Sequence, residues 1–330
     1  MSPSVVIVSP ALADANNGNW RTARRWQQLL QDRHAVRIAR EWPDAQAAQD
    51  HLMLALHARR SAAQVQAWAR QHPGRGLAVV LTGTDLYQDI RRDADAQRSL
   101  DLAQRLVVLQ ERGPDELSQA QRTKTRVIYQ SAAALPPLAK PDDALHVVMV
   151  GHLREVKSPR TLFAAARLLR DRADIRITHI GEGEGAPELA DDARATMHGA
   201  PAYRWVGALP HPDALDHIRR AHLLVHTSAM EGGAHVILEA VRCGTPVLAS
   251  RVPGNVGMLG SDYEGYFPHG DAQALADLLV RARLAQQRQD PAAAWLGRLA
   301  AQCALRAPLF DPAAERAALL SLLQELEAAR

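Results

Sequence analysis

Two short apolar runs, with a glycine-rich turn and a helical segment between them, constrain most strongly how this chain folds. The runs cover residues 223–227 and 246–249, and each has the length and composition of a buried parallel strand. Apolar residues of segment 235–243 recur at helical spacing, and Gly244 is a typical helix stop. The stretch therefore predicts a strand, a turn, a helix and a second parallel strand, which is the repeating unit of open α/β sheets.

The same alternation of strands and helices runs through the chain. Further strands are predicted at residues 4–9, 34–39, 52–57, 77–81, 105–109, 126–129, 146–150, 174–180 and 203–206. A proline-rich polar segment, residues 135–143, separates the two halves. We therefore expect an α/β protein with two doubly wound, Rossmann-like parallel-sheet domains. Their expected limits are 1–138 and 139–310, and a last helix, 311–330, is expected to pack back on the N-terminal domain.

Composition excludes several classes of protein. Of the 330 residues, 47% are apolar, which is enough for two sizeable cores, yet no apolar run is long enough to span a membrane. The first residues lead directly into a strand and predict no signal peptide. The net charge of +3 comes without a dense basic tract, so nothing favours nucleic-acid binding. Cys243 and Cys303 follow no metal-ligand spacing and are expected to be buried free thiols, which fits a cytoplasmic protein.

Small residues and two glutamates surround the start of the helix at residues 235–243. Gly232, Gly233 and Ala234 leave backbone N–H groups accessible, and such a helix end binds anions, phosphate above all. Glu231 precedes the turn and Glu239 lies within the helix. Solvated surface acids are the ordinary interpretation of such glutamates. Their position between two buried strands favours a binding site instead.

Lysine is rare in this chain. Only Lys124, Lys140 and Lys157 are lysines among the 39 basic residues. Because a compact ammonium and a planar guanidinium are not equivalent, a lysine after a predicted strand is informative. Lys157 follows the strand at 146–150, and an ordinary lysine at the start of a helix is the alternative.

Five segments together resemble the GT-B glycosyltransferases, specifically the large retaining family GT4. They are residues 151–157, the glycines at 181 and 183, the pair Val206 and Gly207, the two glutamates eight residues apart at 231 and 239, and the continuation at 243–246. The resemblance is strongest over residues 147–250. It implies two Rossmann-like domains that face a central cleft, with the sugar donor on the C-terminal side.

The resemblance also implies roles for individual residues. Glu239 would bind the ribose hydroxyls of a UDP-sugar, Glu231 would contact the donor sugar, and Lys157 would neutralise the diphosphate leaving group. The family usually has an arginine where this chain has His152, and Arg154 is expected to supply that charge. The remaining donor-binding positions are Gly181, Val206, Gly207, Gly232, Gly233 and Ala234. No suitable Asp-x-Asp sequence is present, so we expect neither a metal nor another cofactor.

The acceptor is expected on the N-terminal side, where three segments follow predicted strands. The first contains Asn17, Gly18, Asn19 and Arg21. The second contains His57, which many family members place near the reacting sugar, followed by Arg59 and Arg60. The third is Thr82, Gly83, Thr84 and Asp85. The ordinary alternatives are a structural histidine, two solvated arginines and a capping turn with Asp85 as the helix N-cap.

The N-terminal segments resemble one branch of the family, the selenosugar synthases of selenoneine biosynthesis (SenB). This resemblance implies a transfer from a UDP-sugar such as UDP-N-acetylglucosamine to selenophosphate, which forms a C–Se bond, and it makes pathway enzymes of selenoneine synthesis possible partners. An ordinary GT4 enzyme with a sugar, lipid or small-molecule hydroxyl acceptor is the main alternative. A non-catalytic nucleotide-sugar-binding protein, and a phosphorylase or epimerase of the same fold, also remain open.

Overall fold

Two six-stranded sheets, each with all of its strands parallel, make up the structure, a computed structural model that describes residues 3–12, 18–287 and 293–328. Each sheet belongs to one of two units. Unit 1 comprises Met1–Ser131, Glu231–Gly233 and Pro312–Arg330, and unit 2 comprises Ala132–Met230 and Ala234–Asp311. The proline-rich segment thus falls within unit 2, where Leu138 N–H donates to the carbonyl of Arg219 over 3.3 Å.

The sheet of unit 1 has the strand order β2-β1-β3-β4-β5-β6. Its strands are β1 (Val5–Val8), β2 (Val36–Ala39), β3 (Leu52–Leu56), β4 (Leu77–Leu81), β5 (Arg105–Val108) and β6 (Thr125–Val127). Its helices are α1 (Gly18–Leu30), α2 (Ala62–Gln71), α3 (Ile90–Arg92), α4 (Ala94–Leu102), α5 (Gln119–Thr123) and α13 (Pro312–Ala328). The chain turns from β1 towards β2 on one side and β3 on the other, so β1 and β3 flank the point where the strand order reverses.

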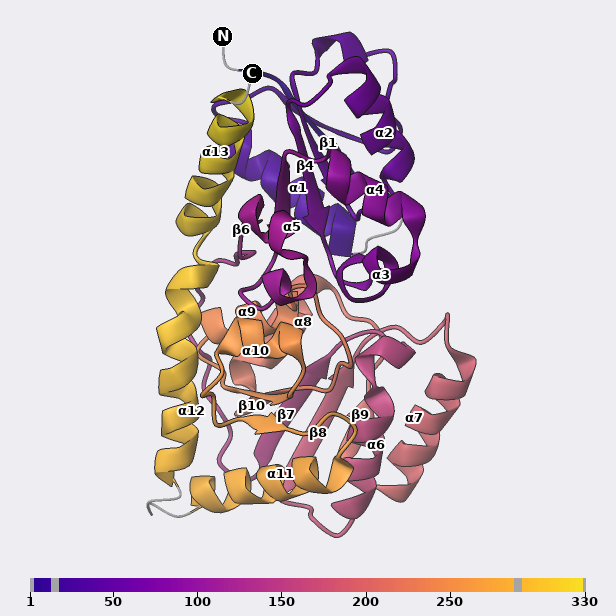
Figure 1. The fold of residues 1–330 in the computed structure, drawn as a ribbon. Coiled ribbons are helices and arrows are strands. Elements are labelled where there is room, and N and C mark those ends of the chain that lie inside the picture. The colour runs from indigo at the N-terminus through magenta and orange to yellow at the C-terminus, as the bar shows by residue number, and fades with distance from the viewer. Residues whose placement is uncertain (1–2, 13–17, 288–292, 329–330) are drawn as a thin grey trace. The chain divides into compact units, whose positions relative to one another are not determined.

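Both faces of this sheet are buried, which explains why its strands are continuous apolar runs. Val6 and Val8 pack into a core cluster with Trp68 of α2 and Leu100 of α4. Their neighbours Val5 and Ile7 point to the opposite face and belong to a second cluster, which α1 and α13 cover (Figure 1). Alternate side chains along each strand therefore pack into two different cores, one on each face of the sheet.

The sheet of unit 2 has the strand order β12-β11-β10-β7-β8-β9. Its strands are β7 (Leu145–Val150), β8 (Ile175–Ile180), β9 (Tyr203–Trp205), β10 (Leu223–His226), β11 (Val247–Ser250) and β12 (Tyr266–Phe267). Its helices are α6 (Pro159–Leu168), α7 (Pro187–Gly199), α8 (His211–Arg220), α9 (His235–Arg242), α10 (Pro253–Leu259), α11 (Ala272–Gln287) and α12 (Ala293–Arg306). The strand order reverses between β7 and β10.

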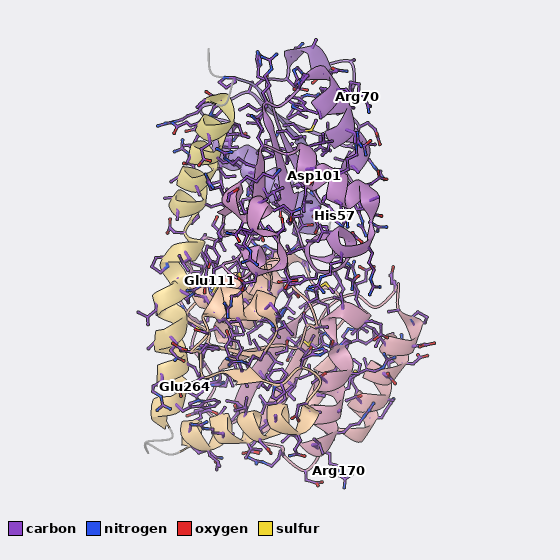
Figure 2. All side chains as sticks on the ribbon, viewed as in Figure 1. His57, Arg70, Asp101, Glu111, Arg170 and Glu264 are labelled. Carbon is purple, nitrogen blue, oxygen red and sulfur yellow. The ribbon has the colours of Figure 1, made fainter. Side chains whose placement is uncertain are left out.

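Charged side chains lie mostly on the outside of both units. Arg70 and Arg170 are exposed, whereas His57 is buried (Figure 2). Cys243 and Cys303 are buried free thiols, as predicted. None of the helices among the described residues combines the length and the apolar character that a membrane span needs.

Candidate donor and acceptor sites

The loops that follow β7 and β8 are joined by backbone hydrogen bonds. Gly151 N–H donates to the carbonyl of Ile180 over 2.8 Å, and Leu153 N–H donates to the carbonyl of Glu182 over 2.8 Å. A Cβ at Gly181 would lie 1.9 Å from the carbonyl oxygen of Gly151, so only glycine permits this approach. His152 accepts a hydrogen bond from Glu182 N–H through Nδ1, over 3.1 Å. The predicted donor residues His152 and Gly181 are therefore parts of one double loop.

A buried histidine that was not predicted from the sequence forms a hydrogen bond to this double loop. His179 lies on β8, fully enclosed, with Nε2 3.1 Å from the carbonyl oxygen of Gly151 and Nδ1 2.9 Å from the hydroxyl of Tyr203. Burial lowers the pKa of His179 to about 4, so the ring is neutral at pH 7. Because a carbonyl oxygen only accepts, Nε2 carries the proton and Nδ1 accepts from Tyr203.

Lys157 lies where the strand order of unit 2 reverses. It ends a 3₁₀ turn (Glu155–Lys157) that leads into α6, and Ser158 between them has a left-handed φ of 46°. The hydroxyl of Thr227, just after β10, donates to the carbonyl of Lys157 over 2.7 Å. The loops from the two strands that flank the reversal are thus bonded to each other, and ligands of doubly wound sheets bind at this kind of place. The half-buried position of Lys157 suits a fixed positive charge.

Arg154 stands at the start of the same turn and is exposed. Within residues 3–12, 18–287 and 293–328, no side chain forms an ion pair with it. His152 and Arg154 both lie on the loop after β7, and which of them supplies the second positive charge stays a prediction.

Glu239 lies in α9 as a buried carboxylate next to two histidines that were not predicted. Its Oε1 is 2.6 Å from Nε2 of His211, the first residue of α8, and 3.3 Å from Nε2 of His235, the first residue of α9. Burial on its own would raise the pKa of Glu239, but the hydrogen bonds from the two histidines outweigh burial and lower it to about 2. Glu239 is therefore ionised and an acceptor only.

The other predicted donor residues follow β9 and β10. Gly207 has a positive φ of 75°, and its carbonyl accepts from Gly181 N–H over 2.8 Å, which places it beside the double loop. Val206 N–H donates to the carbonyl of His179 over 3.0 Å. Ala234 is the N-cap residue of α9 and is buried. Glu231, Gly232 and Gly233 are grouped with unit 1, and Glu231 is buried.

The predicted acceptor residues of unit 1 follow β1, β3 and β4, three neighbouring parallel strands. Gly18 begins α1, and the side chains of Asn19 and Arg21 belong to its first turn. Asn17 lies outside the described residues. His57 follows β3 with an unusual positive φ of 73°, a strained conformation for a residue other than glycine.

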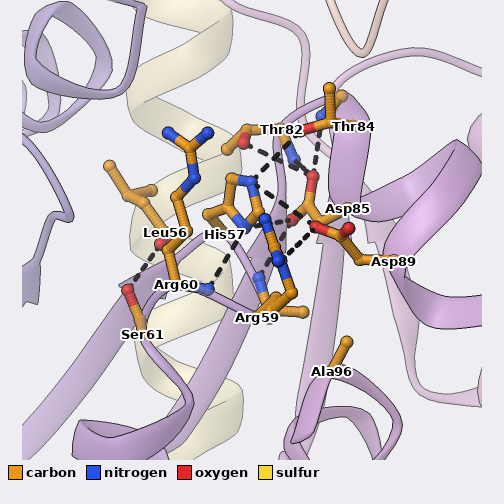
Figure 3. A network of polar contacts seen from close by, with 12 residues as sticks. Leu56, His57, Arg59, Arg60, Ser61, Thr82, Thr84, Asp85, Asp89 and Ala96 are labelled. Carbon is orange, nitrogen blue, oxygen red and sulfur yellow. Dashed lines mark hydrogen bonds and ion pairs between the residues drawn. The ribbon is translucent and has the colours of Figure 1, made fainter. Parts of the chain in front are cut away.

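Asp85 organises the segments after β3 and β4 (Figure 3). Its carboxylate is fully buried and accepts from the N–H groups of Ala58, Thr82 and Gly83 over 2.9–3.0 Å. Asp85 starts a π-helix (Asp85–Asp89) and makes no N-cap hydrogen bond to it, so the alternative of a helix N-cap is wrong. A π-helix is uncommon and is frequent at functional sites.

His57 is neutral in this cluster and its tautomer follows from its contacts. Burial lowers its pKa and the charge of Arg60 adds to this, against the opposing charge of Asp85. Arg60 N–H donates to Nδ1 over 3.4 Å, which leaves the proton on Nε2, 3.2 Å from the hydroxyl of Thr84. His57 thus donates to the hydroxyl of Thr84 from a buried position.

Two arginines beside His57 differ in their pairing. Arg59 forms an ion pair with Asp89 over 3.1 Å. Arg60 is exposed, and no residue in the described part of the chain pairs with its guanidinium (Figure 3). Arg60 is therefore available to an anion, whereas Arg59 is partly neutralised. Two other arginines of α1 have partners within the chain: Arg24 donates to Gln27 over 3.1 Å, and Arg25 pairs with Glu315 over 3.0 Å.

The candidate donor and acceptor residues of the described chain do not form a group of metal ligands. Among the described residues, no three His, Cys, Asp or Glu side chains lie together as a metal site requires. Catalysis without a metal stays a prediction.

Solved structures with the same fold are two-domain glycosyltransferases. Sucrose-phosphate synthase from Thermosynechococcus elongatus superposes with a TM-score of 0.79 at 19% identity, covering 100% of both chains. Anabaena HepE in complex with UDP and glucose gives a TM-score of 0.73 at 15% identity, covering 98% of this chain and 100% of that one. The chain therefore has the two-domain α/β GT-B fold that the sequence predicted.

Comparison of sequences finds similarity that is concentrated in the C-terminal part of the chain. Residues 132–291 match the family model of glycosyl transferases group 1. A D-inositol 3-phosphate glycosyltransferase from Thermobispora bispora is 33% identical over 162 residues, which cover 45% of this chain and 38% of that protein. Another, from Streptosporangium roseum, is 30% identical over 209 residues, which cover 58% of this chain and 46% of that protein. The chain thus matches less than half the length of these relatives.

Proposed function

We propose that the protein is a glycosyltransferase that transfers a sugar from a UDP-sugar to a small acceptor that carries a phosphate group. The observation that carries the proposal is the pair Lys157 and Glu239, a cation on the loop after β7 and an ionised buried carboxylate in α9, both within the residues that match the glycosyl transferases group 1 model. HepE, of the same fold, has been solved with UDP-glucose, which supports a UDP-sugar as donor.

The proposed reaction divides the work between a few residues. The bond between the anomeric carbon and the diphosphate oxygen breaks while the acceptor atom bonds to that carbon. Lys157 stabilises the negative charge that develops on the diphosphate, where fixed charge contributes most to the rate. Glu239 holds the ribose, and His57 orients the hydroxyl of Thr84, which its Nε2 faces, on the acceptor side. Positioning of both substrates provides much of the remaining acceleration.

Arg60 supports a phosphate-bearing acceptor, because its guanidinium matches phosphate oxygens. Two acceptors of this chemistry deserve comparison. The relatives named above act on D-inositol 3-phosphate, which favours a hydroxyl acceptor. The N-terminal segments resemble those of selenosugar synthases, for which selenium of selenophosphate would attack the anomeric carbon and hydrolysis of the P–Se bond would release phosphate.

The test is an incubation with UDP-N-acetylglucosamine or UDP-glucose and one acceptor at a time: inositol 3-phosphate, inositol or selenophosphate. Release of UDP and the mass of the product are measured. We expect product with at least one phosphate-bearing acceptor and little with inositol. Product with inositol alone would contradict the phosphate requirement. UDP binding without turnover in any arm would favour a non-catalytic nucleotide-sugar-binding protein.

A further inference from the structure

Two histidines from different helices converge on one oxygen of Glu239. His211 reaches Oε1 from α8 over 2.6 Å, and His235 reaches the same atom from α9 over 3.3 Å. The Glu239 side chain is only 8% exposed, whereas those of His211 and His235 are 49% and 30% exposed. Solvent-accessible side chains therefore hold a nearly inaccessible carboxylate.

The second oxygen of this carboxylate has a different environment. A carboxylate oxygen offers about two lone-pair positions, so the two imidazoles occupy those of Oε1. In the part of the chain that the structure describes, no group donates to Oε2, and Oε2 is not among the enclosed polar atoms that lack a partner. Oε2 is thus an acceptor that is left for a ligand.

We propose that His211 and His235 are positioning residues, which fix Oε1 so that Oε2 accepts hydrogen bonds from the ribose hydroxyls of the nucleotide. The inference rests on the proposed function, in which Glu239 binds the ribose. It adds a determinant of specificity, because an oxygen that is held as an acceptor discriminates between ribose and a sugar that lacks a hydroxyl donor.

The same contacts make the binding insensitive to moderate acidity. Burial raises the pKa of Glu239 and the two histidines lower it, so without them the pKa rises above its ordinary value of 4.5. A carboxyl group with a raised pKa takes up a proton as the pH falls towards 5 and then loses acceptor strength. With both histidines present, the pKa is about 2 and the carboxylate persists.

Other ionisable groups near α9 do not replace the two histidines. Asp216 of α8 pairs with Arg219, and Arg242 of α9 pairs with Asp311. Burial and the charge of Glu239 raise the pKa of Cys243 to about 11, so this thiol is neutral. The remaining ionisable side chains on the elements that pack against α9 are Asp213, His217 and Arg220 of α8, His226 of β10, and Arg298, Cys303 and Arg306 of α12.

The test measures binding of UDP and of 2′-deoxy-UDP by calorimetry from pH 7.5 to pH 5. The wild-type protein should prefer UDP by about tenfold or more, the value of a lost hydrogen bond to a charged group, with little change across this range. A His211→Ala/His235→Ala variant should bind UDP about tenfold more weakly at pH 7.5, weaken further towards pH 5, and lose most of its preference for UDP.

Three further variants separate positioning from general structural effects. His211→Gln keeps an N–H donor at similar reach and should retain more of the preference than His211→Ala. Glu239→Gln removes the titrating group and should lose the preference at every pH without added pH dependence. His217→Ala changes an exposed histidine of the same helix α8 and should behave as the wild type.

The outcomes are distinct. A double variant that keeps both the preference for UDP and the flat pH profile overturns the inference alone. If that variant does not fold, equal preference in the His211→Ala, His211→Gln and wild-type proteins overturns it. A wild-type protein that binds no UDP overturns the proposed function and this inference with it.

Discussion

At the scale of single residues, three polar side chains of the candidate donor and acceptor sites, His179, Glu239 and His57, are each held in one defined protonation and hydrogen-bonding state. His179 is neutral with its proton on Nε2, and His57 is neutral with its proton on Nε2, in each case because the other nitrogen accepts. Glu239 is ionised because two histidines donate to it. Such fixed states require no rearrangement when a substrate binds, which is the basis of electrostatic preorganisation.

Replacement of Lys157 by alanine should lower kcat by about 10²–10³ while weakening UDP-sugar binding much less, because the charge acts mainly on the leaving diphosphate. Steady-state kinetics measures kcat, and calorimetry measures the dissociation constant of the UDP-sugar. Lys157→Arg, which keeps the charge, should retain part of the activity. Equal losses in kcat and in donor affinity for Lys157→Ala would argue against a transition-state role.

Some of these residues could be predicted from the sequence and others could not. His235 and Glu239 are four positions apart on one helix, so their contact follows from helical spacing and was overlooked. His211 reaches the same oxygen from α8, and this contact depends on how α8 and α9 pack, which no local pattern reveals. Asp85 was assigned to a capping turn as one alternative, but its partners include Ala58 on another loop.

At the scale of elements, α13 is part of the core of unit 1. Leu319, Leu322 and Leu323 join the apolar cluster that also contains Trp26 of α1. The buried carboxylate of Glu315 accepts from Trp26 Nε1 over 2.7 Å and from Ser131 N–H over 2.8 Å. It also forms an ion pair with Arg25 over 3.0 Å. A buried carboxylate with several donors fixes the position of the helix that carries it.

Glu315→Ala should lower the free energy of unfolding of unit 1 by about 3–5 kcal/mol, because the guanidinium of Arg25 and the indole N–H lose a buried partner. Urea unfolding followed by tryptophan fluorescence measures the change, since Trp26 is next to the site. Gln324→Ala, at an exposed position of the same helix, is the matched control and should change stability by less than about 0.5 kcal/mol. A loss as small as that of the control would show that α13 is held by its apolar face alone.

At the scale of the whole molecule, each unit has its own sheet and its own core, so each should have its own unfolding transition. The strand alternation was sufficient to predict this architecture, because buried parallel strands are continuous apolar runs that stand out between helices. The division at Ser131 and Ala132 was harder to predict, since the proline-rich segment that follows it is bonded to unit 2.

UDP alone should raise the unfolding temperature of unit 2. At a UDP concentration about one hundred times its dissociation constant, the free energy of unfolding of this unit should increase by about 2.7 kcal/mol. Differential scanning calorimetry of the wild type and of Glu315→Ala assigns the transitions, since that variant lowers the one of unit 1. An increase in the unfolding temperature of unit 1 alone would contradict the prediction, because it would mean that UDP binds to unit 1.

The membership of α13 in unit 1 has a consequence for biosynthesis. Residues 3–12 and 18–131 emerge early from the ribosome, but the helix that completes one of their two cores is translated after all of unit 2. Until then, Trp26, Leu30 and the strand side chains beneath them lack their cover, which is an aggregation hazard for a nascent chain. Unit 2 meets no such delay, because all six strands of its sheet lie between residues 145 and 267, so the second unit to be translated is the first that can finish folding.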